Sequence, residues 1–209
     1  MKIIYISIWA IFLVGLTLKF LNVVGGATFM SLGCLVLSIH SVIYFIKNSK
    51  TNVANCFLYL SISLVTVYLL FRLQFWANAQ TVFLLTLMVT ITTFVVFFLK
   101  KTKIHTPQIL LLVYSIFFLG LSFTQSYKIY YFEHLNELFN KEAREYDYYS
   151  WDRYSWFLYI GGEQDKAIEV NKKAQDIVNT KLRDYPSSVV RKDSAEINLR
   201  QVLIRDNKW

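Results

Sequence analysis

The stretch QTVFLLTLMVTITTFVVFFL, residues 80–99, contains no charged residue. About 20 apolar residues in an α-helix are needed to cross the hydrocarbon core of a bilayer, so this stretch predicts a membrane-spanning helix. Four other stretches have a similar length and composition, at roughly 4–21, 27–46, 54–72 and 108–126. The separators between them are short, which makes sequential helices antiparallel neighbours. Residues 1–126 of this 209-residue chain are therefore predicted to form a five-helix transmembrane bundle.

The distribution of charge divides the chain at about the same place. All 14 acidic residues lie at or after Glu133, whereas residues 1–132 carry nine of the 22 lysines and arginines. The net charge of +8 thus belongs to the loops of the apolar part, where basic residues record membrane topology. In residues 133–209 basic and acidic residues alternate, unlike the clustered basic face of a nucleic-acid-binding domain. No nucleic-acid partner is expected.

Lysines in two of the predicted loops indicate the orientation in the membrane. Lys47 and Lys50 separate the second and third stretches, and Lys100, Lys101 and Lys103 separate the fourth and fifth. Because cytoplasmic loops are enriched in lysine and arginine, both loops are expected in the cytoplasm. This predicts a multi-pass protein of a bacterial inner membrane with a cytoplasmic N-terminus and a periplasmic C-terminal domain. Single basic residues in the other loops argue for the opposite orientation, but such side chains can snorkel from helix ends.

The remaining residues, 127–209, are predicted to form a soluble extracytoplasmic helical domain, so the whole chain is expected to be all-α. Apolar residues at helical spacing in YKIYYFEHLNELFNKEARE (127–145) predict an amphipathic helix that continues the fifth span. The sequence WDRYSWFLYIGGEQDKAIEVNKKA (151–174) predicts two helices folded around a Gly-Gly turn. Pro186 ends the second of them, and the serines that follow it cap a last helix at about 188–205.

The hairpin at 151–174 resembles a tetratricopeptide repeat. The aromatic, large apolar, turn-glycine and two small packing positions of that family are occupied here by Trp151, Leu158, Gly162, Ala167 and Ala174. Glycine permits the positive φ that such a turn needs, and two alanines seven residues apart on one face allow the helices to approach closely. The resemblance implies a protein-docking module. Since one repeat cannot bury both of its faces, the flanking helices are expected to pack against it.

Eight aromatic residues crowd positions 146–159, which is more than one buried stripe can hold. Tyrosine and tryptophan suit surfaces that are partly apolar and partly wet, so some of them are expected at a partner or at the bilayer interface. The residues predicted to bind a partner are Trp156, Tyr159, Lys172 and Lys173. A four-helix cap that is stabilised internally and has no partner is the alternative.

The predicted spans contain polar residues at helical spacing but no carboxylate. The second span carries a stripe of small residues, Ala27, Ser31, Cys34, Ser38 and Ser41. Such stripes are the usual means of close helix approach in lipid. The fourth span carries Thr86, Thr90 and Thr93 on one face. Helix packing is the favoured interpretation of both faces, and a hydroxyl-lined transport path is the alternative.

His40 is the titratable residue that lies well inside a predicted span. A haem at His40 would need a second axial ligand from another subunit, so a histidine hydrogen-bonded between helices is the preferred interpretation. Cys34 and Cys56 are expected to be small buried residues, because neither has another cysteine or a histidine at metal-ligand spacing. The sequence contains no recognisable catalytic motif, and no enzymatic activity, cofactor or metal is expected.

A second resemblance concerns LKFLNVVGGATFMSLG, residues 18–33. Lys19, Gly25, Gly26 and Gly33 are similar to positions in the transmembrane hairpin of the type IX secretion and gliding-motility motor stator. That family carries an acidic residue in its second helix for proton coupling, and this hairpin has none. The resemblance therefore implies a membrane hairpin without the energised chemistry.

These features predict a non-catalytic accessory or assembly subunit of a bacterial inner-membrane complex. Its membrane helices would bind other inner-membrane subunits within the lipid bilayer, and its C-terminal domain would dock an extracytoplasmic protein. A small-molecule or lipid transporter is the alternative suggested by the hydroxyl faces of the second and fourth spans. An electron-transfer subunit with a haem at His40 is a further alternative.

Overall fold

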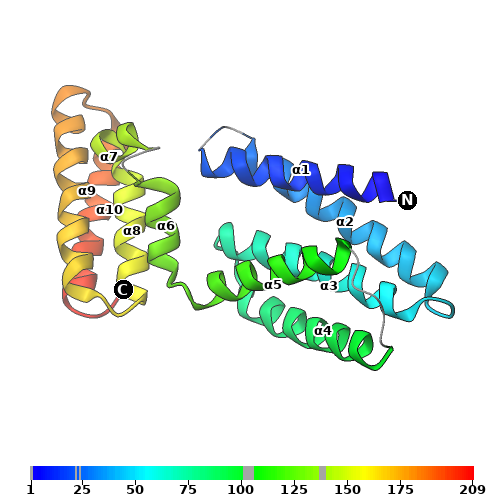
Figure 1. Ribbon diagram of the computed structural model, residues 1–209. Helices are drawn as coiled ribbons and strands as arrows, with labels where there is room; N and C mark the ends of the chain where they lie inside the picture. The colour runs from blue at the N-terminus through cyan, green and yellow to red at the C-terminus, as the bar shows by residue number, and fades with distance from the viewer. Residues whose placement is uncertain (1, 22, 24, 101–105, 137–139) are drawn as a thin grey trace. The chain divides into compact units, whose positions relative to one another are not determined.

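A computed structural model describes residues 2–21, 23, 25–100, 106–136 and 140–209. Within these ranges every regular element is an α-helix (Figure 1), which confirms the predicted helical class. The chain divides into two compact units, an N-terminal unit of residues 1–124 and a C-terminal unit of residues 125–209.

The N-terminal unit is built from apolar helices. Over its described residues they are α1 (Lys2–Phe20), α2 (Gly26–Asn48), α3 (Val53–Leu73), α4 (Ala79–Lys100) and α5 (Thr106–Phe123). Three of them, α2, α3 and α4, are long and apolar enough to cross a membrane, and each begins and ends within two residues of its predicted bounds. In α1 and α5 the described apolar segments are shorter, at Ala10–Phe20 and Leu111–Phe123.

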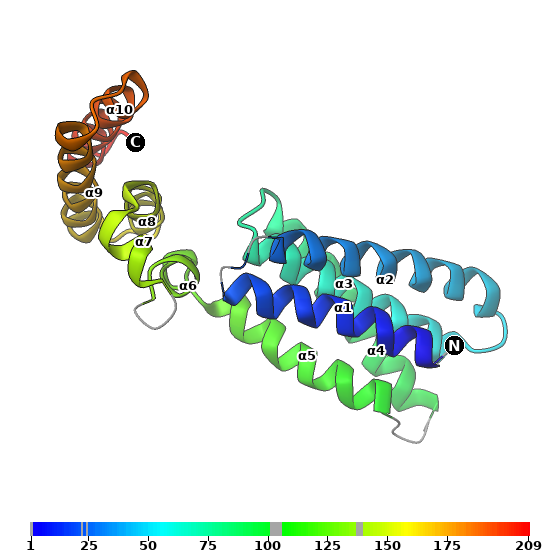
Figure 2. The same ribbon diagram turned by 90° about the horizontal axis from the view of Figure 1, so that it is seen from above.

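Helix α3 lies at the centre of this unit and packs against α2, α4 and α5, whereas α1 packs against α2 (Figure 2). Buried residues extend along most of α3, from Ala54 to Leu73. The outward faces of the other helices are apolar and exposed; Ile46 and Phe98, for example, are 72% and 84% exposed. An apolar surface of this extent needs an apolar environment or a partner.

Helices α1 and α2 touch through their backbones. A Cβ atom added to Gly15 would lie 2.3 Å from the backbone nitrogen of Met30, and one added to Gly26 would lie 2.5 Å from that of Lys19. A Cβ on Gly33 would likewise lie 2.9 Å from the Phe12 backbone. The glycines are therefore what allows the two helices to approach so closely.

The predicted small-residue stripe lies only partly at a helix interface. Cys34 and Ser41 are buried, and the Ser41 hydroxyl donates a hydrogen bond to the Tyr59 carbonyl of α3 at 3.0 Å. Ser38 is half-buried and accepts a hydrogen bond from Ser63 of α3 at 3.0 Å. The other two members, Ala27 and Ser31, are exposed and half-buried, respectively. The later part of the stripe thus joins α2 to α3.

The three threonines of α4 are buried and face α3. The hydroxyls of Thr90 and Ser61 lie 2.9 Å apart in a hydrogen bond, and Thr86 and Thr93 donate to the Leu64 and Phe57 carbonyls at 3.2 and 3.1 Å. Each such bond between membrane helices contributes about 0.6 kcal/mol on average. The hydroxyl face of α4 therefore holds α4 against α3.

The C-terminal unit begins with two short helices, α6 (Ser126–His134) and α7 (Lys141–Tyr146). The prediction of one helix over 127–145 that continues the fifth span is wrong in two places. The chain is extended at Gln125, between α5 and α6. Helix α6 then ends at His134, where the Asn140 side-chain amide donates to the Glu133 carbonyl at 2.8 Å and satisfies an acceptor that a longer helix would have bonded. Residues 137–139 lie outside the described ranges.

The rest of the C-terminal unit consists of α8 (Tyr148–Ile160), α9 (Gln164–Asp184) and α10 (Ser188–Arg205). Helix α9 packs against both α8 and α10, and α6 packs against α8. Leu135, Trp151, Val178 and Ile197 belong to one buried cluster that connects these helices. As predicted, a serine caps the last helix: the Ser187 hydroxyl accepts a hydrogen bond from the Val190 N–H at 3.1 Å.

Candidate docking surface

The turn between α8 and α9 contains a glycine in the left-handed conformation. Gly162 has a φ of 82°, a conformation that glycine adopts without strain. Ala167 and Ala174 are both fully buried, and Leu158 and Trp151 are buried with them. Of the five predicted hairpin residues, Gly162 therefore lies in the turn and the other four are buried in the C-terminal unit.

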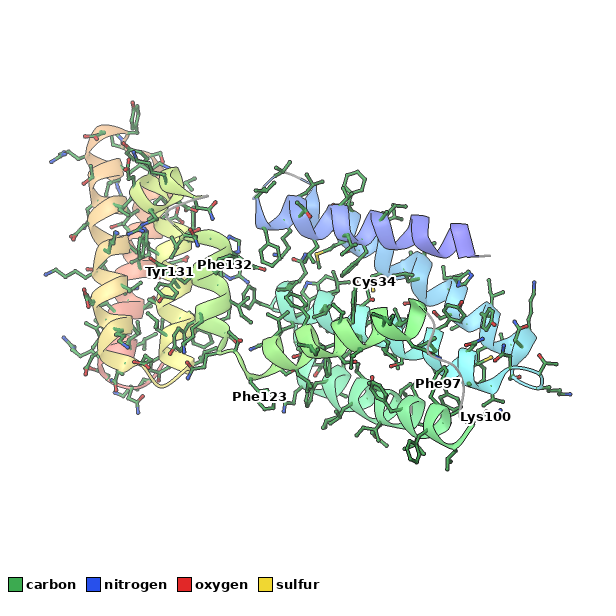
Figure 3. The ribbon with its side chains drawn as sticks, in the orientation of Figure 1. Cys34, Phe97, Lys100, Phe123, Tyr131 and Phe132 are labelled. Atoms are coloured by element: carbon green, nitrogen blue, oxygen red, sulfur yellow. The ribbon has the colours of Figure 1, made fainter. Side chains whose placement is uncertain are left out.

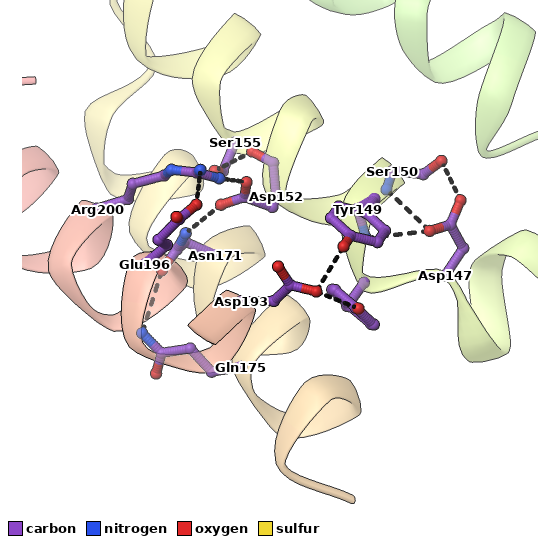
Figure 4. A network of polar contacts seen from close by, with 11 residues as sticks. Asp147, Tyr149, Ser150, Asp152, Ser155, Asn171, Gln175, Asp193, Glu196 and Arg200 are labelled. Carbon is purple, nitrogen blue, oxygen red and sulfur yellow. Dashed lines mark hydrogen bonds and ion pairs between the residues drawn. The ribbon is translucent and has the colours of Figure 1, made fainter. Parts of the chain in front are cut away.

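Helix α10 is attached to the hairpin by a polar network (Figure 4). The Asp152 carboxylate of α8 is buried and forms an ion pair with Arg200 of α10. Its other oxygen accepts a hydrogen bond from Asn171 of α9 at 3.2 Å, and Asn171 in turn accepts one from Gln175 at 3.2 Å. A buried carboxylate with these partners fixes the register of three helices at once.

A second polar contact joins the first turn of α8 to α10, about one turn before Asp152. The hydroxyls of Tyr148 and Tyr149 both donate to Oδ2 of Asp193, the former at 2.7 Å. The hydrogen bonds from Tyr149 and Tyr148 lower the pKa of Asp193. Burial, followed by the hydrogen-bonding and charge effects of its neighbours, raises the pKa of Tyr148. The carboxylate therefore stays charged and the phenol stays neutral across the physiological range.

The two aromatic residues predicted to bind a partner lie together but are covered by the chain itself. The rings of Trp156 and Trp209 are 4.8 Å apart, and those of Tyr159 and Trp209 are 5.9 Å apart. The Tyr159 hydroxyl also donates to Asn207 at 3.1 Å. Trp156 and Tyr159 are consequently half-buried beneath the residues that follow α10.

Of the two predicted lysines, Lys173 lies beside Trp151. Both lysines are exposed, and the Lys173 ammonium lies 3.7 Å from the centre of the Trp151 ring. Burial, and then the positive charge of Arg144, lower the pKa of Lys173. Trp151 and Tyr159 are eight residues apart in α8, which corresponds to about 12 Å along a helix. Lys173 thus lies apart from the Tyr159 end of the aromatic pair, and the four predicted residues do not form one continuous site.

His40 lies on α2 among aromatic side chains of α2 and α3. Its ring centre is 6.4 Å from that of Tyr44 and 6.1 Å from that of Tyr59. Cys34 and Cys56 are free thiols and both are buried, as expected; Figure 3 labels Cys34 within the N-terminal unit. In the described part of the chain, no group of three or more histidine, cysteine, aspartate or glutamate residues lies close enough to hold a metal ion.

Comparison with known proteins adds no relative: no protein-family model, curated protein or solved structure matches the chain. Its class is therefore defined by its own features. It is an all-helical protein, over the residues described, with helices that can cross a membrane and a compact C-terminal helical unit. Sequence reasoning missed Trp209, whose contacts with Trp156 and Tyr159 join distant segments of the chain. It also missed a groove lined by Tyr146 of α7 and by Asp176 and Ile177 of α9, which likewise come from distant segments.

Proposed function

We propose that this protein is a non-catalytic accessory or assembly subunit of a bacterial inner-membrane complex. All five helices of the N-terminal unit would span the membrane, with Lys47, Lys50 and Lys100 on the cytoplasmic side and the C-terminal unit in the periplasm. The membrane helices would bind other inner-membrane subunits. The tetratricopeptide-like hairpin of the C-terminal unit would dock an extracytoplasmic protein.

The observation that supports this proposal most directly is how the polar groups of the N-terminal unit are used. The hydroxyls of Thr90 and Ser61 bond to each other, and those of Thr86, Thr93 and Ser41 bond to backbone carbonyls of α3. The outward faces of α2 and α4 expose apolar side chains instead. Polar groups turned inward and apolar faces turned outward suit a unit that packs against lipid and other membrane helices.

Copurification from native membranes tests the proposal. We would purify the full-length chain and a chain ending at Lys128 in mild detergent and identify by mass spectrometry the proteins that accompany each. A partner set that accompanies the full chain, part of which is lost with the truncation, is the expected result. If the full-length chain is isolated alone or only with itself, the accessory-subunit function is wrong.

A lipid transporter is the second candidate, and one observation favours it. An apolar groove of about 790 Å³ lies near the end of α4 and the start of α5, lined by residues that include Phe94, Phe98 and Leu112. A groove of this composition suits an acyl chain. Transport predicts that a specific phospholipid raises the melting temperature of the purified protein, whereas an accessory subunit is expected to show no such selectivity.

A further inference from the structure

A groove in the C-terminal unit combines exposed aromatic rings with acidic side chains. It has a volume of about 500 Å³ and is lined by residues of α7, the second half of α9 and the chain just after α9. Ile177 at the groove packs against the buried core cluster. Two tyrosines that line it, Tyr146 and Tyr185, remain 69% and 75% exposed. The groove therefore has an apolar base and two rings free to contact a ligand.

The charge of the lining is negative. Glu145, Asp176 and Asp184 line the groove, together with one lysine, Lys181. The Lys181 ammonium lies 5.2 Å from the centre of the Tyr148 ring, and Asp184 also forms an ion pair with Arg183 at 3.4 Å. The lining residues have a formal charge of −2, which becomes −1 when the Arg183 guanidinium paired with Asp184 is included; the C-terminal unit as a whole is nearly neutral.

We propose that this groove binds a basic segment of a protein partner. An arginine or lysine of that segment would place its alkyl chain over Ile177, stack its cationic group on Tyr146 or Tyr185, and pair with the neighbouring carboxylates. Arginine suits this arrangement best, because a guanidinium both stacks on aromatic rings and binds carboxylates with two hydrogen bonds. The inference rests on the proposed function, since it specifies the chemistry of the extracytoplasmic partner.

Charge complementarity is the reason for choosing a protein segment rather than the bilayer. Exposed tyrosines alone would also suit the membrane interface. Three carboxylates beside them would be repelled by the phosphates of anionic lipids, whereas they attract a basic peptide.

The test uses the full-length protein in lipid nanodiscs and a fluorescent eight-residue peptide that alternates arginine and leucine. The test variant is Asp176→Asn combined with Asp184→Asn. The control, which removes one charge, is Glu169→Gln, an exposed carboxylate on α9 that does not line the groove. The double variant is expected to bind the peptide about ten-fold more weakly, since each exposed ion pair contributes up to about five-fold in affinity. The control is expected to bind the arginine peptide with the affinity of the unmodified protein. The unmodified protein is expected to bind a peptide with citrulline in place of arginine no more tightly than the double variant binds the arginine peptide.

Three results would overturn the inference. One is equal peptide affinity of the double variant and the Glu169→Gln control. A second is an unchanged partner set when the double variant is purified from native membranes, in which case the accessory function stands and the groove plays no part in it. If even the unmodified chain brings no partner, the proposed function itself fails. A photo-cross-linker at Tyr185 that captures only a second copy of this chain also refutes a distinct basic partner.

Discussion

Replacement of Gly15 by alanine tests the close approach of α1 and α2 most directly. The added methyl group would lie 2.3 Å from the Met30 backbone nitrogen, whereas ordinary contacts of a Cβ atom begin at about 3.4 Å. Because the obstacle is backbone rather than a flexible side chain, the two helices must separate by about 1 Å. Overpacking of this kind typically costs about 1–3 kcal/mol.

The chain offers a matched control in Gly120→Ala. A Cβ on Gly120, in α5, meets nothing within 4 Å. Both substitutions gain the same helix propensity of up to about 1 kcal/mol, so the difference between them isolates the steric cost. At about 4 °C per kcal/mol for a unit of this size, Gly15→Ala should melt roughly 4–12 °C below Gly120→Ala.

The two buried thiols supply the assay. Cys34 and Cys56 are the cysteines of the sequence and both lie in the N-terminal unit, so a dye that becomes fluorescent on reaction with thiols reports the melting of that unit alone. Melting curves are recorded in the same detergent for both variants and for the unmodified protein. Equal melting temperatures for Gly15→Ala and Gly120→Ala would refute the backbone contact.

Three further predictions concern hydrogen bonds and ion pairs. Thr90→Val leaves the Ser61 hydroxyl without its partner and should lower stability by about 0.5–1.5 kcal/mol, measured by the same thiol melt. Arg200→Leu leaves the buried Asp152 carboxylate without its ion pair and should lower the stability of the C-terminal unit by about 2–3 kcal/mol in urea unfolding followed by tryptophan fluorescence; adding Asp152→Asn should restore part of the loss. The tyrosine hydroxyls lower the pKa of Asp193, so the ionised Asp193 carboxylate stabilises the folded protein at pH values above its ordinary pKa of 3.8. This stabilisation is lost as the pH falls through the lowered pKa. The difference in stability between the unmodified protein and Asp193→Asn should therefore narrow below that pH.

The helices that are long and apolar enough to cross a membrane could be predicted, because the thickness of a bilayer sets both the length and the composition of such a helix. The bounds of α2, α3 and α4 follow from it to within two residues. The break between α6 and α7 could not be predicted in the same way, since residues 127–145 contain neither glycine nor proline. Hydrogen bonds from side chains end these helices: Asn140 donates to the Glu133 carbonyl, and the Trp151 indole donates to the Arg144 carbonyl.

In the candidate site, too, features within one short segment could be predicted from the sequence, whereas contacts between distant segments could not. The hairpin positions Gly162, Ala167 and Ala174 could be identified from the resemblance to a tetratricopeptide repeat, because the pattern of that repeat lies within one short segment. The contact between Trp156 and Trp209 joins residues more than 50 positions apart, and no local pattern records it. The acidic groove could not be predicted for the same reason, because Glu145 and Asp184 line the same groove only in the folded C-terminal unit.

The position of Trp209 has a consequence for any ligand of the neighbouring aromatic pair. A protein that binds Trp156 and Tyr159 must either include the Trp209 indole in its contact surface or displace it from them. In the second case the chain competes with its own ligand, and the apparent affinity falls in proportion to the fraction of molecules in which the indole has moved away. The residues after α10 would then raise the ligand concentration needed to occupy half of the aromatic pairs.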